Sequence, residues 1–103
     1  MILIYGLSSS SDPENIRYIG KDIDIKKRLK KHLSSYELKS DTHKNMWIKL
    51  ELLNGNDIIS TELYRFESEN WQDVEIEWID RYKKLGYKLT NSTIGGDGFV
   101  MTE

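Results

Sequence analysis

The sequence predicts a small α/β sandwich in which a three-stranded, mostly antiparallel sheet is flanked by about three helices. Two short β-favouring runs open the chain, and apolar residues then recur three times at helical spacing. A further β-branched run lies between the second and third helical segments. The expected order is therefore β-β-α-α-β-α. No repeat or linker interrupts the 103 residues, so we expect residues 1–103 to form a single domain.

The first two strands are expected to form an antiparallel hairpin. Met1–Leu7 is short, apolar and β-favouring, and Ile16–Gly20 has the same character. Residues Ser8–Asn15 between them are polar and contain an Asp-Pro pair, which is typical of a turn. The third strand is expected at Ile58–Phe66, because this run is rich in β-branched and aromatic residues.

The first two helices are predicted from capping residues and apolar spacing. The first is expected to start at Asp22 or Asp24 and to run to about residue 33, beneath a strongly basic face. The second is expected to start near residues 40–41 and to end at Asn54-Gly55, a typical C-terminal stop. Its apolar residues recur at helical spacing and predict its buried stripe: Met46, Trp47, Leu50 and Leu53.

The last helix is predicted to run from a Ser68 cap to Leu85, and its apolar stripe contains one charged residue. Glu75 lies four residues after Trp71 and four before Ile79, inside that stripe. A buried unpaired carboxylate is costly, so Glu75 requires a cation, a strong hydrogen-bond partner or a cleft. A glutamate at the edge of the stripe, paired with a basic side chain, is an equal alternative. The stripe comprises Trp71, Val74, Trp78, Ile79, Tyr82 and Leu85.

The composition is that of a globular domain and excludes several kinds of site. Hydrophobic residues make up 38% and charged residues 31% of the chain. The absence of cysteine excludes a disulfide framework, a zinc-thiolate site and a thiol nucleophile. The apolar start is too short for a signal peptide, and no stretch is long enough to span a bilayer. We therefore expect a cytoplasmic protein without a membrane partner.

The net charge of −2 conceals a strong segregation of charge along the chain. Residues 17–49 carry ten Lys or Arg against four Asp or Glu, whereas residues 50–80 carry one Arg against nine acids. A molecule polarised in this way has one surface suited to phosphates. A lysine-rich face can also be merely solvated, so charge alone does not decide between the two.

Five further positions carry side chains suited to phosphate chemistry, and each also has an ordinary structural explanation. Arg28 can hold a phosphate bidentately, and His32, one turn later, can donate to the same group. Tyr5 and Tyr18 are central in the two hairpin strands and can face one side of the sheet. A phenol has a pKa of ~10 and is a poor base unless a metal or a cation lowers it. Asn91 follows the last helix, where a simple turn residue fits equally well.

Taken together, these positions resemble the GIY-YIG nuclease family over nearly the whole chain. The resemblance rests on five motifs that occur in the family's order. They are Leu3-Ile4-Tyr5, with leucine where the family has glycine; Tyr18-Ile19-Gly20; the arginine helix at residues 27–33 with its trailing histidine; the acidic-helix motif at residues 74–79; and Leu89-Thr90-Asn91, followed by Gly95-Gly96-Asp97-Gly98.

The resemblance implies metal-dependent endonuclease activity on DNA, leaving 5′-phosphate and 3′-hydroxyl ends. Glu75 would hold one divalent metal, Mg²⁺ or Mn²⁺, and Arg28 would clamp the scissile phosphate. Glu77 is a second acid nearby, but it projects about 200° around the helix from Glu75, so Glu75 is the expected ligand.

The resemblance also assigns roles to the remaining site residues. Tyr5 would act as the general base for the attacking water, or would orient it, and Tyr18 would help to place the nucleophile. His32 would support either the phosphate or Tyr5. Asn91 would order the site by hydrogen bonding.

The basic face is expected to contact DNA weakly and in a salt-sensitive manner. Because the catalytic-like motifs account for the whole chain, an attached or separate domain is expected to read the target sequence. We expect a monomer that serves a homing-type or phage endonuclease, in a bacterial cell or a phage-infected host. The lysines expected to contact DNA are Lys21, Lys26, Lys27, Lys30, Lys31 and Lys44.

The alternative is a non-catalytic module on the same fold that binds nucleic acid or another protein. Its support is the low net charge and the acidic stretch at residues 50–80, which would repel DNA unless it faced away. A divalent cation at Glu75 within reach of Tyr5 and Arg28 would favour the nuclease. A Glu75 paired only with Lys or Arg side chains would favour the binding module.

Overall fold

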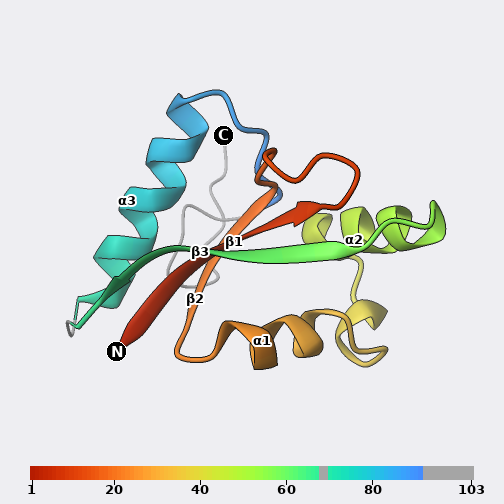
Figure 1. Cartoon of the computed structure of the whole chain (residues 1–103), viewed down its shortest axis with the longest axis horizontal. Helices are drawn as coiled ribbons and strands as arrows, with labels where there is room; N and C mark the ends of the chain where they lie inside the picture. The colour runs from red at the N-terminus through yellow and green to blue at the C-terminus, as the bar shows by residue number, and fades with distance from the viewer. Residues whose placement is uncertain (68–69, 92–103) are drawn as a thin grey trace.

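The chain has the predicted order β-β-α-α-β-α around a three-stranded antiparallel sheet (Figure 1). The structure is a computed structural model and describes residues 1–67 and 70–91. The strands lie in the order β2-β1-β3, and β1 pairs antiparallel with both neighbours, which confirms the predicted fold class. The elements are β1 (Ile2–Ser9), β2 (Tyr18–Asp22), α1 (Ile25–His32), the 3₁₀ helix η1 (Glu37–Lys39), α2 (His43–Leu53), β3 (Ile58–Phe66) and α3 (Trp71–Lys84).

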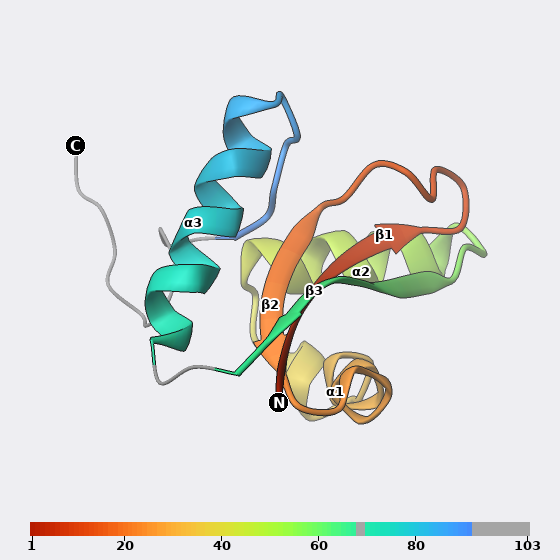
Figure 2. The ribbon, with the colours of Figure 1, turned by 60° about the vertical axis from the view of Figure 1, so that its left-hand side comes forward.

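Helices cover both faces of the sheet, because successive side chains of each strand point in opposite directions. Tyr5 and Leu7 of β1 point toward α1 and α2, where they form a core with Trp47 and Ile48. Ile4 of β1 points to the other face and packs in a second core with residues of α3. Figure 2 shows α3 on one side of the sheet and α1 and α2 on the other. None of these helices, within the described residues, is long and apolar enough to cross a membrane.

The first two strands are shifted toward the C-terminus relative to their predicted bounds. Ser8 and Ser9 were expected in the loop, but they continue β1 and are buried, because they pair with Ile59 and Ile58 of β3. The second strand begins at Tyr18 and not at residue 16. Pairing with a third, distant strand therefore overrides the polar composition of this segment.

α2 buries a different face from the one its apolar spacing predicts. Trp47 is buried as expected, but the other predicted stripe residues are exposed: Met46, Leu50 and Leu53. The buried face instead includes Lys44, Asn45 and Ile48. Asn45 Nδ2 donates to the carbonyl oxygens of Glu37 and Ser40, at 2.9 and 3.0 Å. These hydrogen bonds anchor the first turn of α2 to the preceding η1 segment and set the rotation of the helix.

α3 packs through the predicted stripe except at its C-terminal end. Ile79 is fully buried, and the partly buried stripe residues before and after it pack against the same core. Leu85, predicted as part of the stripe, caps the helix and is 67% exposed. The predicted cap Ser68 lies outside the described residues, and Asn70 precedes the first turn. At that turn, Lys21 Nζ lies 3.8 Å from the ring centroid of Trp71, which ties α3 to the end of β2.

The β1–β2 register brings the ring of Tyr5 over Gly20. The two residues are direct partners in the ladder, and both are buried. A Cβ atom at Gly20 would lie 2.6 Å from Tyr5 Oη and 2.7 Å from its Cζ, closer than any side chain tolerates. The Tyr5 ring can therefore cross to the neighbouring strand only because residue 20 has no side chain.

Gly20→Ala is expected to destabilise the protein by about 1–3 kcal/mol, because the added methyl forces the buried Tyr5 ring aside. The free energy of unfolding from urea titration measures this. The matched control is the same substitution in a Tyr5→Leu background, where the crowding is absent and the cost should be close to zero. An equal cost in both backgrounds would contradict the proposed contact.

Candidate active site

Tyr5 and Tyr18 face the same side of the sheet, as the hairpin pattern predicted. Tyr5 is opposite Gly20 and Leu7 is opposite Tyr18, so the two phenols lie diagonally on the face covered by α1 and α2. Their ring centroids are 6.4 Å apart. A bulge in the β1–β3 pairing falls between Ile4 and Tyr5, directly beside the first phenol. Bulges commonly redirect a side chain next to a functional site.

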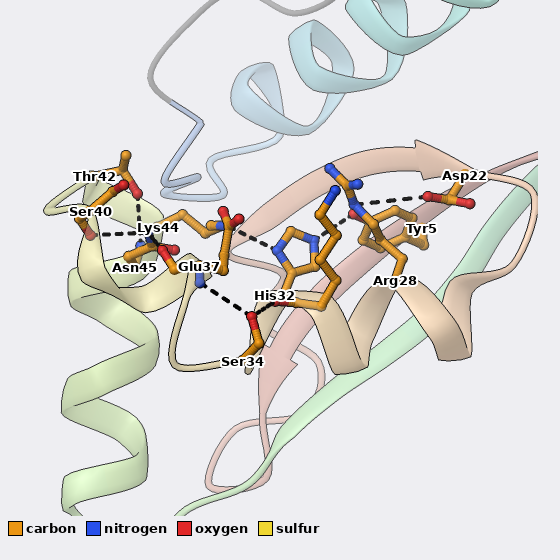
Figure 3. Close-up of polar contacts among 11 residues, drawn as sticks. Tyr5, Asp22, Arg28, His32, Ser34, Glu37, Ser40, Thr42, Lys44 and Asn45 are labelled. Carbon is orange, nitrogen blue, oxygen red and sulfur yellow. Dashed lines mark hydrogen bonds and ion pairs between the residues drawn. The ribbon is translucent and has the colours of Figure 1, made fainter.

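His32, the last residue of α1, packs against both tyrosines and is fully buried. Its Nε2 is 2.7 Å from Tyr5 Oη (Figure 3). Its ring also meets the Tyr18 ring edge-on, with the centroids 5.4 Å apart. Of the two contacts the sequence allowed, phosphate or Tyr5, the structure places His32 against Tyr5.

Arg28, one turn before His32 on α1, lies at the open side of this cluster. Its guanidinium lies near the hydroxyl of Tyr5, and its Nε is 3.8 Å from Asp22 Oδ2. Within the described residues, that Nε has no hydrogen-bond partner although it is buried. A surface depression of about 370 Å³ adjoins it and is lined by Asp22, Ile23, Asp24, Lys27, Arg28 and Lys31. The Arg28 side chain is 34% exposed and lines this depression, so its guanidinium can meet a ligand that enters there.

Asn91 closes the outer edge of β2. Its Oδ1 accepts from the backbone N–H of Ile19 at 3.0 Å, and its Nδ2 donates to the carbonyl of Ile19 at 2.8 Å. Thr90 continues this pairing, since both its N–H and its hydroxyl donate to the carbonyl oxygen of Arg17. The segment that contains Asn91 therefore satisfies edge groups of β2, the strand that carries Tyr18.

Glu75 reaches the cluster from the opposite face of the sheet. It is half-buried on α3, which packs chiefly on β2, the edge strand. Burial raises the pKa of Tyr18, and the charge of Glu75 raises it further. The carboxylate is therefore within electrostatic reach of Tyr18, which lies on β2, the strand that α3 packs against most.

Burial keeps both Tyr5 and His32 neutral. Desolvation, followed by the neighbouring Tyr18, raises the pKa of Tyr5 far above its usual value, and Arg28 opposes this shift. Desolvation, followed by the charge of Lys44, lowers the pKa of His32 to about 3. The resting site therefore contains an un-ionised phenol and an un-ionised imidazole in contact.

The predicted DNA-binding lysines separate into three groups. Lys44 was predicted on the basic face, and this is corrected: it is buried and points to His32 and Glu37, because the first turn of α2 faces inward. Lys21 is half-buried against Trp71. The other four are exposed on α1: Lys26, Lys27, Lys30 and Lys31.

Two parts of this cluster had no signal in the sequence. Lys44 was expected among the lysines that contact DNA, and Glu37 was not singled out at all. Their proximity to His32 depends on the turn between α1 and α2, which no local pattern defines. The Gly-rich segment at residues 95–98 lies outside the described residues.

Stability should fall as the pH drops below 6.5. The pKa of His32 is about 3 in the folded protein against 6.5 ordinarily, so protons bind the unfolded chain first. Between about pH 6.5 and 5, where few carboxylates titrate, the loss should approach 1 kcal/mol per pH unit. Chemical denaturation at each pH measures this slope. His32→Gln should remove it and His43→Gln should retain it; equal slopes in all three proteins would contradict this account.

Comparison with known proteins agrees with the geometry. A model of the GIY-YIG catalytic domain matches residues 1–88, which include Tyr5, Tyr18, Arg28, His32 and Glu75 and end just before Asn91. Neither the comparison with curated proteins nor that with solved structures gave a match. Domains of this family are generally endonucleases that act on DNA and depend on a divalent metal. The chain therefore belongs to the GIY-YIG catalytic domain family.

Proposed function

We propose that this domain hydrolyses phosphodiester bonds of DNA with the help of a divalent metal, leaving 5′-phosphate and 3′-hydroxyl ends. One observation carries the proposal: Arg28 lies beside the hydroxyl of Tyr5 and lines an open depression that a ligand can enter. A guanidinium in this position can donate to a phosphate oxygen, the acceptor that best suits its planar set of donors.

Glu75 is the residue that would hold the metal. No cluster of three or more His, Asp or Glu side chains that could hold an ion occurs within residues 1–67 and 70–91. A lone carboxylate is unsuited to a metal that needs a complete protein cage, but it fits Mg²⁺ or Mn²⁺, which keep water ligands and bind substrate phosphate. The bound metal would stabilise charge on the leaving 3′ oxygen.

Arg28 would position the scissile phosphate and offset the negative charge that develops on it. Its guanidinium is always protonated and presents several donors in one plane. The nearby Tyr5 hydroxyl and Asp22 carboxylate help to hold the side chain in place before substrate arrives. This preorganisation makes the interaction effective when charge develops.

Tyr5 would orient the attacking water or accept its proton, and Tyr18 would help to place that water. The raised pKa of Tyr5 opposes a role as base in the resting site. Arg28 works against this shift, and a phosphate-bound metal would add further positive charge. Asn91 would keep Tyr18 in position by holding the edge of β2.

DNA would approach along α1, with affinity supplied by backbone phosphates. The four exposed lysines of this helix share α1 with Arg28, where they can contact backbone phosphates. Binding should therefore be weak and strongly salt-dependent. We propose that a separate or attached domain supplies sequence preference, as in a homing-type or phage endonuclease, and that this domain acts as a monomer.

Glu75→Gln should lower cleavage of supercoiled plasmid in Mg²⁺ or Mn²⁺ by about 100-fold or more, because the amide cannot hold the metal. Gel analysis of nicked and linear products measures the rate. Glu77→Gln is the matched control: this residue is two positions away, exposed, and paired with Arg81 at 2.8 Å. It should cut at the wild-type rate, and a chelator should stop all cutting. Equal losses in both variants would exclude Glu75 as the specific ligand.

Arg28→Lys should lower kcat by about 100-fold while KM for DNA changes little, because lysine keeps the charge but not the planar set of donors. Single-turnover cleavage of a short duplex separates binding from chemistry. Lys27→Ala, an exposed neighbour on α1, should weaken binding slightly and leave kcat intact. If the duplex is bound but never cut by wild-type protein, the non-catalytic binding module is the better explanation.

A further inference from the structure

A buried lysine lies directly behind the histidine of the candidate active site. Lys44 is the second residue of α2, and its side chain is only 9% exposed. Its Nζ is 2.8 Å from Nδ1 of His32 and 3.1 Å from Oε2 of Glu37 (Figure 3). An apolar side chain would fill this space without the cost of burying an ammonium group. The charge itself is therefore the feature that requires an explanation.

The ammonium group determines which nitrogen of His32 carries the proton. A protonated lysine can only donate, so Nδ1 of the neutral imidazole must accept. The ring proton then lies on Nε2, and Nε2–H donates to Tyr5 Oη at 2.7 Å. Burial lowers the pKa of Lys44, but its hydrogen bond to the Glu37 carboxylate favours the charged form.

The surroundings of His32 also disfavour a charged imidazole. Apart from the two phenols, the groups whose charge acts on the ring are three cations and one carboxylate: Arg28, Lys31, Lys44 and Glu37. A second ring proton on Nδ1 would face the Lys44 ammonium at 2.8 Å. His32 is consequently a poor acceptor for a proton from Tyr5.

We propose that Lys44 is a positioning residue that holds His32 as the Nε2–H tautomer, so that His32 donates to the Tyr5 oxygen. The catalytic role of Lys44 rests on the proposed nuclease function, whereas the tautomer of His32 does not depend on that function. Donors from His32 and Arg28 then converge on Tyr5 Oη and stabilise negative charge there. A proton that leaves the phenol passes to water, and His32 remains neutral throughout.

Nitrogen-15 NMR of the histidine side chains tests the tautomer in the wild-type protein. The chain has only two histidines, so a His43→Gln variant assigns both sets of signals. We expect His32 to show a protonated Nε2 and an unprotonated Nδ1 that persist from about pH 8 to pH 5. An Nδ1–H tautomer, or protonation of His32 within that range, would overturn the proposal whether or not the protein cuts DNA.

Lys44→Met tests the cause, since it removes the charge and keeps the length of the side chain. The tautomer preference should weaken, and the titration midpoint of His32 should rise toward ~6.5. Loss of a group that orients a histidine typically costs about 10- to 100-fold in activity, and we expect this in kcat with KM unchanged. Lys49 lies on the same helix and pairs with Asp41 at 3.1 Å. Lys49→Met should leave the His32 tautomer, its titration midpoint and kcat unchanged.

The two proposals can fail separately. An unchanged His32 spectrum in folded Lys44→Met would overturn the role of Lys44 even if wild-type protein is an active nuclease. The expected spectra in a protein that never cuts DNA would support the role of Lys44 in setting the tautomer and contradict the nuclease. Should Lys44→Met fail to fold, the wild-type spectrum still decides whether His32 donates to Tyr5.

Discussion

The crossing of Tyr5 over Gly20 is the constraint on which the rest of the site depends. The phenol reaches across the hairpin only because β1 and β2 pair in one register and residue 20 has no Cβ. A slip of one residue would turn Tyr5 toward α3 and would turn Ile4 toward α1 and α2. With the register fixed, the hydroxyl of Tyr5 arrives at His32 and Arg28, two residues on successive turns of α1. The motifs Leu3-Ile4-Tyr5 and Tyr18-Ile19-Gly20 are thus one structural unit, because Gly20 leaves the space that the Tyr5 ring occupies.

The sheet divides the candidate chemistry between its two faces. Tyr5, Tyr18, Arg28 and His32 lie on the face covered by α1 and α2, whereas Glu75 belongs to the helix on the other face. The two parts can cooperate because β2 is an edge strand that carries Tyr18, packs against α3 and holds Asn91 on its outer side. The edge strand, and not proximity in the chain, thus connects the two parts.

A polar chain runs into the core behind the site. It leads from Tyr5 through His32 and Lys44 to Glu37, and most of it is shielded from water. Such a network is destabilising when incomplete, because each buried group needs its partner. It explains why α2 turns polar residues inward and leaves Leu50 and Leu53 exposed. Burial and the three neighbouring cations keep His32 neutral, and only the carboxylate of Glu37 opposes them.

Periodicity and turn chemistry determined the element types, their order and the three strands, because these depend on neighbours in the chain. The apolar stripe of α3 was predictable from the sequence, and so was the position of the charged Glu75 within it. The resemblance of five motifs added the nuclease expectation and the roles of six site residues: Tyr5, Tyr18, Arg28, His32, Glu75 and Asn91. The inward face of α2 and the burial of Lys44 were not predictable, because hydrogen bonds from Asn45 to η1 outweigh apolar spacing. The contact between Lys44 and His32 was decided by tertiary structure alone, since eleven residues of mostly irregular chain and short helix separate two side chains that meet at 2.8 Å.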